Sequence, residues 1–341
     1  MLDTQSAASF AELRRILAEF PGPDLDSATR AAERETQLTK PTGALARLEE
    51  IASWLATWQG RHPAAVNHPR VAVYAGNHGI ADRGVSAYPR EVTQQMVLNF
   101  QAGGAAINQL CKNADADLRV YEMCLDQPTK DFTRAPALSE EEGARAMAYG
   151  MMCVEPGVDL LCVGEMGIAN TTSAAAIAAA LFGGTGSDWA GPGTGVQGAQ
   201  LKRKAEVIDE GLALHRAKFT DGFEIMRCLG GHELAAIVGA VMAARMARVP
   251  VLLDGFASTV AACILLKSHP GALDHCLVAH CSAEPGHRRL LTEIGKKPLL
   301  DLGMRLGEGS GAALAIPIVR AAALCHAGMA TFAEAGVSNK E

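Results

Sequence analysis

The sequence contains few aromatic residues and lacks the motifs of several large enzyme classes. Phe, Trp and Tyr make up 5% of the chain, so Ala, Val, Leu and Ile must supply most of the buried apolar surface. No glycine-rich segment ends in Gly-Lys-Ser or Gly-Lys-Thr, which excludes a P-loop nucleotide-binding site. Ser282 and Ser310 do not lie in a Gly-x-Ser-x-Gly motif, which argues against a serine hydrolase.

The cysteine and histidine spacings do not indicate a metal site or a disulfide framework. The chain has nine cysteines, an odd number, and no two of them form a Cys-x-x-Cys pair. His280 and His287 match no common set of metal ligands. Most of the cysteines lie in apolar runs, where a free cysteine behaves as a small hydrophobic residue. We therefore expect no metal, no cofactor and a reducing, cytoplasmic environment.

The charge pattern excludes a nucleic-acid face and shows no membrane span. The chain has 31 basic and 37 acidic residues, and the basic triplet Lys202–Lys204 is too short to bind a nucleic acid. Residues 1–20 contain no basic segment followed by an apolar one, so we expect no signal peptide. The apolar stretch near residue 250 is interrupted by Arg245, Arg248 and Asp254, too soon to cross a bilayer.

Apolar periodicity predicts helices up to about residue 60 and an alternation of strands and helices from residue 71 onward. Short apolar runs predict strands, and helical spacing predicts the segments between them. Such an alternation is typical of an α/β protein with a doubly wound, mainly parallel sheet and helices on both faces. The predicted strands are Val71–Ala75, Leu118–Glu122, Asp159–Val163, Val249–Leu253 and Cys276–Ala279. The predicted helices between them are Glu91–Phe100, Ser139–Met151, Thr171–Leu181, Lys202–His215 and Leu234–Met246.

Polar and glycine-rich segments follow four of the five predicted strands. They are Gly76–Gly79, Gly164–Gly167, Asp254–Phe256 and His280–Glu284. The carboxyl ends of parallel strands meet at one edge of a sheet, and ligands of open α/β sheets bind at that edge. The sequence therefore predicts a site built from these loops.

A second glycine-rich segment, Gly191-Pro192-Gly193-Thr194-Gly195, precedes a helix that carries Lys202 and Lys204. Backbone N–H groups in such a loop can hold a phosphate, and the alternative is an ordinary surface turn. A dinucleotide-binding fingerprint fits poorly because no strand precedes these glycines.

Two glutamates lie within glycine-rich runs. Glu165 follows a predicted strand, and Asn170 or Thr171 can cap the helix that comes after it. Glu308 lies between Gly307 and Gly309, in a backbone that lets a carboxylate approach a ligand closely. The alternative for Glu308 is a solvated loop acid. Burial would raise its pKa and neighbouring N–H groups would lower it; we expect it to be ionised near neutral pH in either case.

Taken together, these segments resemble the nicotinate-nucleotide–dimethylbenzimidazole phosphoribosyltransferase family, which makes the lower-ligand nucleotide of cobalamin. The matching segments occur in order along nearly the whole chain, and those around Glu165 and Glu308 are the most specific. They are Lys40–Leu45, His78–Ile80, Val92–Thr93, Gly164–Thr172, Pro250–Phe256, Ser282–Glu284 and Met304–Ala313.

The resemblance implies an architecture and roles for individual residues. It implies a large Rossmann-like domain, residues 66–311, a small helical domain formed by residues 1–65 and 312–341, and a homodimer. Glu308 matches the proposed general base, Glu165 matches a second catalytic glutamate, and Lys204 matches a phosphate partner behind the glycine loop of Gly191, Gly193 and Gly195.

The resemblance also implies a substrate-binding set. Tyr88 and Met96 correspond to residues that line the base pocket, where some members have Ser and Gln; some members have Asp in place of Asn77. We therefore expect a more apolar base pocket in this protein. The remaining residues of this set are Met166, Asn170, Thr171, Ser282, Leu306 and Gly307.

The implied reaction is transfer of the phosphoribosyl group of nicotinate mononucleotide to 5,6-dimethylbenzimidazole or a related base. The products would be α-ribazole 5′-phosphate and nicotinate, with inversion at the anomeric carbon. Two alternatives stay open: a pyridine-nucleotide-dependent dehydrogenase on the same fold, and a catalytically silent nucleotide-binding protein. The missing dinucleotide fingerprint argues against the first, and the presence of Glu165 and Glu308 argues against the second.

Overall fold

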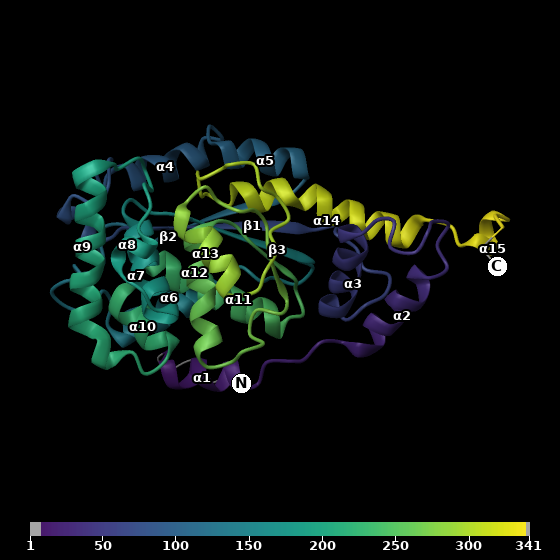
Figure 1. The fold of residues 1–341 in the computed structure, drawn as a ribbon, viewed down its shortest axis with the longest axis horizontal. Helices are drawn as coiled ribbons and strands as arrows, with labels where there is room; N and C mark the ends of the chain where they lie inside the picture. The colour runs from purple at the N-terminus through teal and green to yellow at the C-terminus, as the bar shows by residue number, and fades with distance from the viewer. Residues whose placement is uncertain (1–7, 339–341) are drawn as a thin grey trace.

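A computed structural model describes residues 8–338 and contains one five-stranded sheet (Figure 1). All strand pairs are parallel, and the spatial order is β2-β1-β3-β4-β5. The order reverses between β1 and β3, and in open α/β sheets such a switch point opens the crevice where ligands bind. The α/β fold and all five predicted strands are confirmed. Their bounds are β1 Pro69–Gly76, β2 Asp117–Met123, β3 Leu160–Met166, β4 Val251–Leu253 and β5 Cys276–Val278.

Helices cover both faces of this sheet. In Figure 1, α4, α5 and α14 run along one side, while α6, α10 and α11 lie on the other. The five helices predicted between the strands are present, each within four residues at its first position. The α-helices are α1 Phe10–Ala18, α2 Leu25–Glu35, α3 Arg47–Gln59, α4 Val92–Gln101, α5 Ala106–Ala114, α6 Glu140–Met151, α7 Asn170–Phe182, α8 Gly186–Trp189, α9 Gly198–His215, α10 Gly222–Leu229, α11 His232–Met246, α12 Phe256–Cys263, α13 Pro285–Glu293, α14 Ser310–Gly328 and α15 Phe332–Ala335; the 3-10 helices are η1 Gly79–Arg83, η2 Arg216–Lys218 and η3 Ile264–Lys267.

The strands divide the apolar core in two because their side chains alternate between the faces. On β1, Ala72 and Tyr74 belong to the core beneath α6 and α11, whereas Val71 and Val73 belong to the core beneath α5 and α14. Every residue of β1 is buried, as expected for a central parallel strand. The sheet is therefore a rigid support for the loops at its carboxyl edge.

Helices α2 and α3 pack with α14, near the C-terminus, whereas α1 lies apart from them (Figure 1). Both α2 and α14 pack against α3, and the Arg34 guanidinium donates to the carbonyl oxygens of His326, Ala327 and Met329. In contrast, α1 packs on α6, and its Phe10 ring lies 5.6 Å from the ring of Phe223 in α10. The domain division at residues 65/66 and 311/312 stays a prediction, and α1 is in contact with the large unit.

Helix α14 is a long apolar helix that is not among the helices predicted from the sequence. Its length and composition would suffice to cross a membrane, but half of its most apolar window is buried within the protein. Its buried side chains, including Ile316 and Val319, belong to the core that it shares with α3 and α5. In this fold α14 serves as a core helix.

Candidate active site

The loops at the carboxyl edge of the sheet enclose a cavity of about 490 Å³. It lies at the ends of β3, β4 and β5 and is bounded by the segment 85–96 and by the turn at residues 193–194. The predicted edge is therefore where the structure gathers polar groups. The predicted residues that line this cavity are Tyr88, Met96, Glu165, Met166, Asn170, Thr171, Gly193, Ser282, Leu306, Gly307 and Glu308.

The loop that carries Glu308 has an uncommon backbone conformation. Gly307, Glu308 and Gly309 have φ angles of 81°, 63° and 76°, in the left-handed region that glycine tolerates and glutamate rarely adopts. The Glu308 N–H donates to the Glu165 carbonyl at 3.0 Å, and the Gly309 N–H donates to Asp254 at 3.2 Å. These bonds hold the Glu308 side chain at the cavity wall against the preference of its own backbone.

Glu308 is a buried carboxyl group, and one of its oxygens makes no hydrogen bond within the described residues. Its residue exposure is 4%, and its Oε2 has no hydrogen-bond partner among the described residues. Burial raises the Glu308 pKa from 4.5 to about 7; the nearby Asp254 carboxylate adds to this and the Ile107 N–H opposes it. Burial, which raises the Glu308 pKa, therefore outweighs the N–H group that lowers it, and this settles the balance that the sequence left open. A pKa of about 7 leaves about half of the Glu308 carboxyl groups ionised at neutral pH and able to accept a proton.

Replacing Glu308 with Gln should stabilise the protein at alkaline pH. Raising a carboxyl pKa from 4.5 to about 7 makes the ionised folded state less stable, and that penalty grows as the pH rises from 4.5 through 7. We expect the variant to be more stable than the wild type by about 3 kcal/mol at pH 8 and by less than about 1 kcal/mol at pH 5. Urea unfolding at the two pH values measures this difference; an equal difference at both would contradict the buried, shifted carboxyl.

Glu165 is in a different electrostatic state from Glu308. Burial raises the Glu165 pKa well above its ordinary value, and the carboxylates of Asp254, Glu233 and Glu308 raise it further, while the Asn170 amide, which donates to Glu165 Oε2, opposes the shift. Burial and the neighbouring carboxylates therefore favour the protonated form of Glu165. Of the two predicted catalytic glutamates, Glu308 is the one whose pKa, raised to about 7, lies in the range that suits a general base at neutral pH.

Replacing Glu165 with Gln should accordingly have a small effect on catalysis. A glutamine amide has nearly the shape of a protonated glutamic acid and keeps an oxygen for the Asn170 amide. We expect kcat to stay within about tenfold of the wild-type value, in contrast to the loss on removing a general base. Steady-state rates decide this, and a loss as large as that of the corresponding Glu308 variant would show that Glu165 reacts in its ionised form.

Of the predicted phosphate residues, Gly193 lines the cavity, Lys204 and Gly191 are buried behind its wall, and Gly195 is exposed. Lys204 is 1% exposed, and its ammonium donates to Thr171 Oγ1 at 2.8 Å and to the Gly191 carbonyl at 2.9 Å. Burial lowers the Lys204 pKa to about 8, with Glu284 opposing the shift. Gly191 and Gly195 do not line the cavity. The role of Lys204 as a phosphate partner stays a prediction; in this structure it supports Thr171 and the glycine turn.

Arg305 is the cation that does reach the cavity. It lines the wall, is exposed, and donates from Nη1 to the Gly193 carbonyl at 2.8 Å. The glycine turn is therefore held from behind by Lys204 and from the cavity side by Arg305. Together with Thr171, these groups form the most cationic side of an otherwise acidic pocket.

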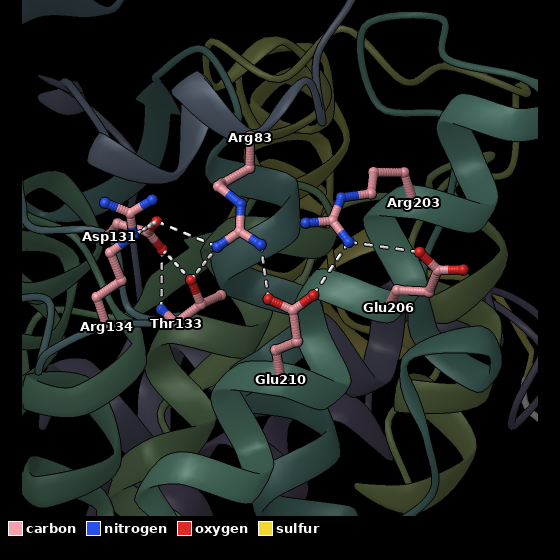
Figure 2. Close-up of polar contacts among 7 residues, drawn as sticks. All are labelled: Arg83, Asp131, Thr133, Arg134, Arg203, Glu206 and Glu210. Carbon is pink, nitrogen blue, oxygen red and sulfur yellow. Dashed lines mark hydrogen bonds and ion pairs between the residues drawn. The ribbon is translucent and has the colours of Figure 1, made fainter.

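A polar network fixes the wall that carries Tyr88. Thr194 Oγ1 lies 2.9 Å from Ser86 Oγ and accepts from the Ala87 N–H at 3.1 Å, which joins this wall to the glycine turn. Arg83, which precedes this wall in the sequence, forms an ion pair with Asp131 at 3.3 Å. Figure 2 shows the wider network, in which Glu210 of α9 bridges two guanidinium groups and Arg83 also contacts a threonine hydroxyl. The members of that network are Arg83, Asp131, Thr133, Arg134, Arg203, Glu206 and Glu210.

The side of the cavity that Tyr88 and Met96 line is mainly apolar, and its assignment to the base stays a prediction. Tyr88 and Leu306 are each 56% exposed, and Val92, Met96 and Phe256 also line this space. Flat apolar and aromatic side chains of this kind suit a planar ring. Asn77, in contrast, does not line the cavity: its amide donates to the Leu125 carbonyl at 2.8 Å and so supports a neighbouring loop.

Several lining residues were not assigned a role from the sequence. Phe256, His280 and Glu284 lie in strand-end loops that the sequence does predict, so their position carried a signal. Thr194 belongs to the predicted glycine-rich segment, whereas Ser86 carried no signal, since its contact with Thr194 joins segments 108 residues apart. No group of three or more His, Cys, Asp or Glu side chains within residues 8–338 is arranged to hold a metal ion.

The sequence and the fold both match proteins of one family. A family model described as "Phosphoribosyltransferase" matches residues 20–337. Nicotinate-nucleotide–dimethylbenzimidazole phosphoribosyltransferase of Rhizobium meliloti (strain 1021) is 58% identical over 336 residues, which are 98% of this chain and 99% of that protein. The enzyme of the same name from Sinorhizobium fredii is 57% identical over the same shares of the two chains.

A solved structure of the protein of that name from Thermus thermophilus has a TM-score of 0.86 with this fold. The two are 41% identical, and the match covers 92% of this chain and 99% of the other. A second structure from the same organism has a TM-score of 0.88, 42% identity and full coverage of its own chain. The chain therefore belongs to the nicotinate-nucleotide–dimethylbenzimidazole phosphoribosyltransferase family.

Proposed function

We propose that this protein transfers the phosphoribosyl group of nicotinate mononucleotide to 5,6-dimethylbenzimidazole or a related base. The products would be nicotinate and α-ribazole 5′-phosphate, the nucleotide of the cobalamin lower ligand. The observation that carries the proposal is the Glu308 carboxyl, held at the wall of a substrate-sized cavity with one free oxygen and a pKa raised by burial to about 7. Family membership supports the choice of substrates.

The proposed reaction requires a general base but no general acid. The glycosidic nitrogen of the donor already belongs to a pyridinium ring, so nicotinate leaves with the bonding electron pair and without protonation. The acceptor nitrogen attacks the anomeric carbon from the opposite face, which inverts β to α. The new bond makes the benzimidazole cationic, and its remaining N–H proton passes to the Glu308 carboxylate. Atoms and charges then balance without an external oxidant or reductant.

The remaining groups position the two substrates. The apolar wall of Tyr88 and Met96 would hold the flat acceptor, and the side formed by Thr171, Gly193 and Arg305 would hold the anionic end of the donor. Lys204 supports that side from behind through Thr171 and Gly191. Holding both substrates in line for displacement is the larger part of what such a site contributes.

An acceptor panel tests the proposed function. The protein is incubated with nicotinate mononucleotide and, separately, with benzimidazoles, purines and phenols, and the products are identified by mass. We expect a phosphoribosyl adduct of the benzimidazoles together with released nicotinate. Absence of any adduct, or reduction of a pyridine nucleotide in its place, would contradict the proposal and favour another activity.

Acceptor choice should depend on Tyr88. Replacing Tyr88 with Ser removes an aromatic face from the base side of the cavity, so we expect substituted benzimidazoles to lose more kcat/KM than unsubstituted benzimidazole, by about 3- to 10-fold. Competition between the two acceptors in one reaction measures the ratio directly. An unaltered acceptor ranking would place the base elsewhere in the cavity.

We also propose a cytoplasmic homodimer. All nine cysteines are unpaired in the structure, as expected in a reducing compartment. Light scattering coupled to size-exclusion chromatography tests the assembly: a particle of twice the 35.7 kDa chain mass supports it, and a monomer at micromolar concentration contradicts it.

A further inference from the structure

One wall of the cavity carries buried polar atoms that have no partner within the protein. Among the described residues, both ring nitrogens of His280 and the Oε2 atom of Glu284 are buried without a hydrogen bond, and both side chains line the cavity. His280 is 1% exposed and Glu284 is 5% exposed. Leaving such groups unpaired is costly, so their persistence at a cavity wall points to partners on a ligand.

The His280 ring is held rigidly while its nitrogens stay free. A side chain on Gly311 would place its Cβ 2.0 Å from His280 Cδ2, so only glycine allows the ring to lie there. Its Nε2 atom is 3.7 Å from Asp254 Oδ1, too far for a hydrogen bond. The ring is therefore positioned by packing, and both of its nitrogens lack a hydrogen bond within the described residues.

The Glu284 carboxylate is held by one oxygen only. Its Oε1 accepts from the Gly193 N–H at 2.8 Å, and its backbone N–H donates to Ser282 Oγ at 3.3 Å. The other oxygen, Oε2, has no partner among the described residues. A side chain on Gly191 would meet this oxygen at 2.0 Å, so the glycine turn also makes room for the carboxylate.

These two side chains suit hydroxyl groups better than the other parts of the donor. A carboxylate repels a phosphate, and unpaired polar atoms gain nothing from an aromatic ring. A hydroxyl group can donate to the free carboxylate oxygen and can exchange a hydrogen bond with a ring nitrogen. Vicinal hydroxyls, two adjacent donor–acceptor groups, match the chemistry of a wall that offers one carboxylate oxygen and one imidazole.

We propose that His280 and Glu284 bind the 2′- and 3′-hydroxyls of the donor ribose and select ribonucleotides over deoxyribonucleotides. This inference rests on the proposed function, since it takes the donor to be a ribonucleotide. It assigns the sugar to a wall that adjoins the cationic side through the hydrogen bond from the Gly193 N–H to Glu284. Since the two side chains touch the sugar whose anomeric carbon reacts, they also fix its orientation for in-line attack.

The test compares nicotinate mononucleotide with its 2′-deoxy and 3′-deoxy analogues. Their affinities for the wild type and for the Glu284→Gln and His280→Asn variants are measured by calorimetry, which needs no turnover. We expect at least one deoxy analogue to bind the wild type about 10- to 100-fold more weakly than the ribonucleotide. In the variants this ratio should shrink toward one, because the ribonucleotide loses affinity and the deoxy analogue does not.

A surface variant serves as the control. Glu206→Gln makes the same chemical change on the exposed face of α9, away from the cavity, and should keep the wild-type ratio. Thermal unfolding shows which variants are folded, and His280→Gln replaces His280→Asn if the latter is not. Equal affinities of the wild type for ribo and deoxy nucleotides, or equal losses for both in the variants, would overturn the inference. Nucleotide binding without any transfer product would instead count against the proposed function alone.

Discussion

Replacing Glu308 with Gln should lower kcat by about 10²–10⁴, the range typical for removal of a general base. Glutamine keeps the size of the side chain and an oxygen for the Ile107 N–H but cannot accept the benzimidazole proton. The acceptor KM should change much less, because the lost interaction belongs to the transition state. Initial rates with saturating nicotinate mononucleotide at pH 8, where the wild-type carboxyl is mostly ionised, measure the effect.

The pH dependence provides an independent signature of the same group. With a Glu308 pKa raised by burial to about 7, the wild-type rate should rise with pH up to about 7 and then level off, because only the ionised form accepts a proton. The Gln variant should lack this rise. A variant with near wild-type kcat, or one with an unchanged pH profile, would remove Glu308 from the role of base.

A matched acceptor separates proton transfer from positioning. 1,5,6-Trimethylbenzimidazole attacks through its free nitrogen and forms a cation that has no N–H proton to lose. With this acceptor, the Glu308→Gln variant and the wild type should react at similar rates. A loss as large as that with 5,6-dimethylbenzimidazole would mean that Glu308 acts by its charge or by its placement, and not by taking a proton.

Replacing Gly164 with Ala should disrupt the Glu308 loop from a position that no substrate touches. The added Cβ would lie 2.2 Å from the Gly309 nitrogen and 2.5 Å from its Cα, so the backbone of that loop must move. A displacement of about 1 Å at a catalytic group can cost about 10²-fold in rate. We expect a fall of that order in kcat/KM and a loss of stability of about 1–3 kcal/mol from overpacking.

The control for this experiment is Gly22→Ala. A Cβ on Gly22 meets no atom within 4 Å, and its φ lies outside the left-handed region, so activity and stability should stay close to wild type. Kinetics and urea unfolding of both variants complete the comparison. If Gly164→Ala keeps full activity, the loop does not need its close approach to β3.

Much of this fold could be predicted because the spacing of apolar residues in the sequence indicates where the strands and helices lie. The strand around Val71–Ala75 is an uninterrupted apolar run, which is what burial on both faces of a parallel strand requires. A strand-end glycine segment likewise places Glu165 at the carboxyl edge of the sheet. Glu308 follows no strand, and only the structure brings its loop to the same cavity. The element boundaries were less exact, as for β4, which begins at Val251 and not at Val249.

The electrostatics of the site could not be predicted in the same way. A glutamate between glycines can be solvated or buried, and only the packing of β3 against the Glu308 loop decides between a low and a raised pKa. Lys204 illustrates the same limit. A lysine after a glycine turn suggests a phosphate contact, but the turn of α9 directs its ammonium inward, onto Thr171 and Gly191. Such outcomes depend on distances between segments far apart in sequence.

The configuration of the product tests the central claim most directly. Wild-type protein is incubated with β-nicotinate mononucleotide and 5,6-dimethylbenzimidazole, and the anomeric configuration of the nucleotide formed is determined by NMR. Direct displacement with Glu308 as the base predicts α-ribazole 5′-phosphate, in equal amount to the nicotinate released. A β product would show retention through a covalent intermediate, and nicotinate release without a new nucleotide would show hydrolysis; either result would contradict the account.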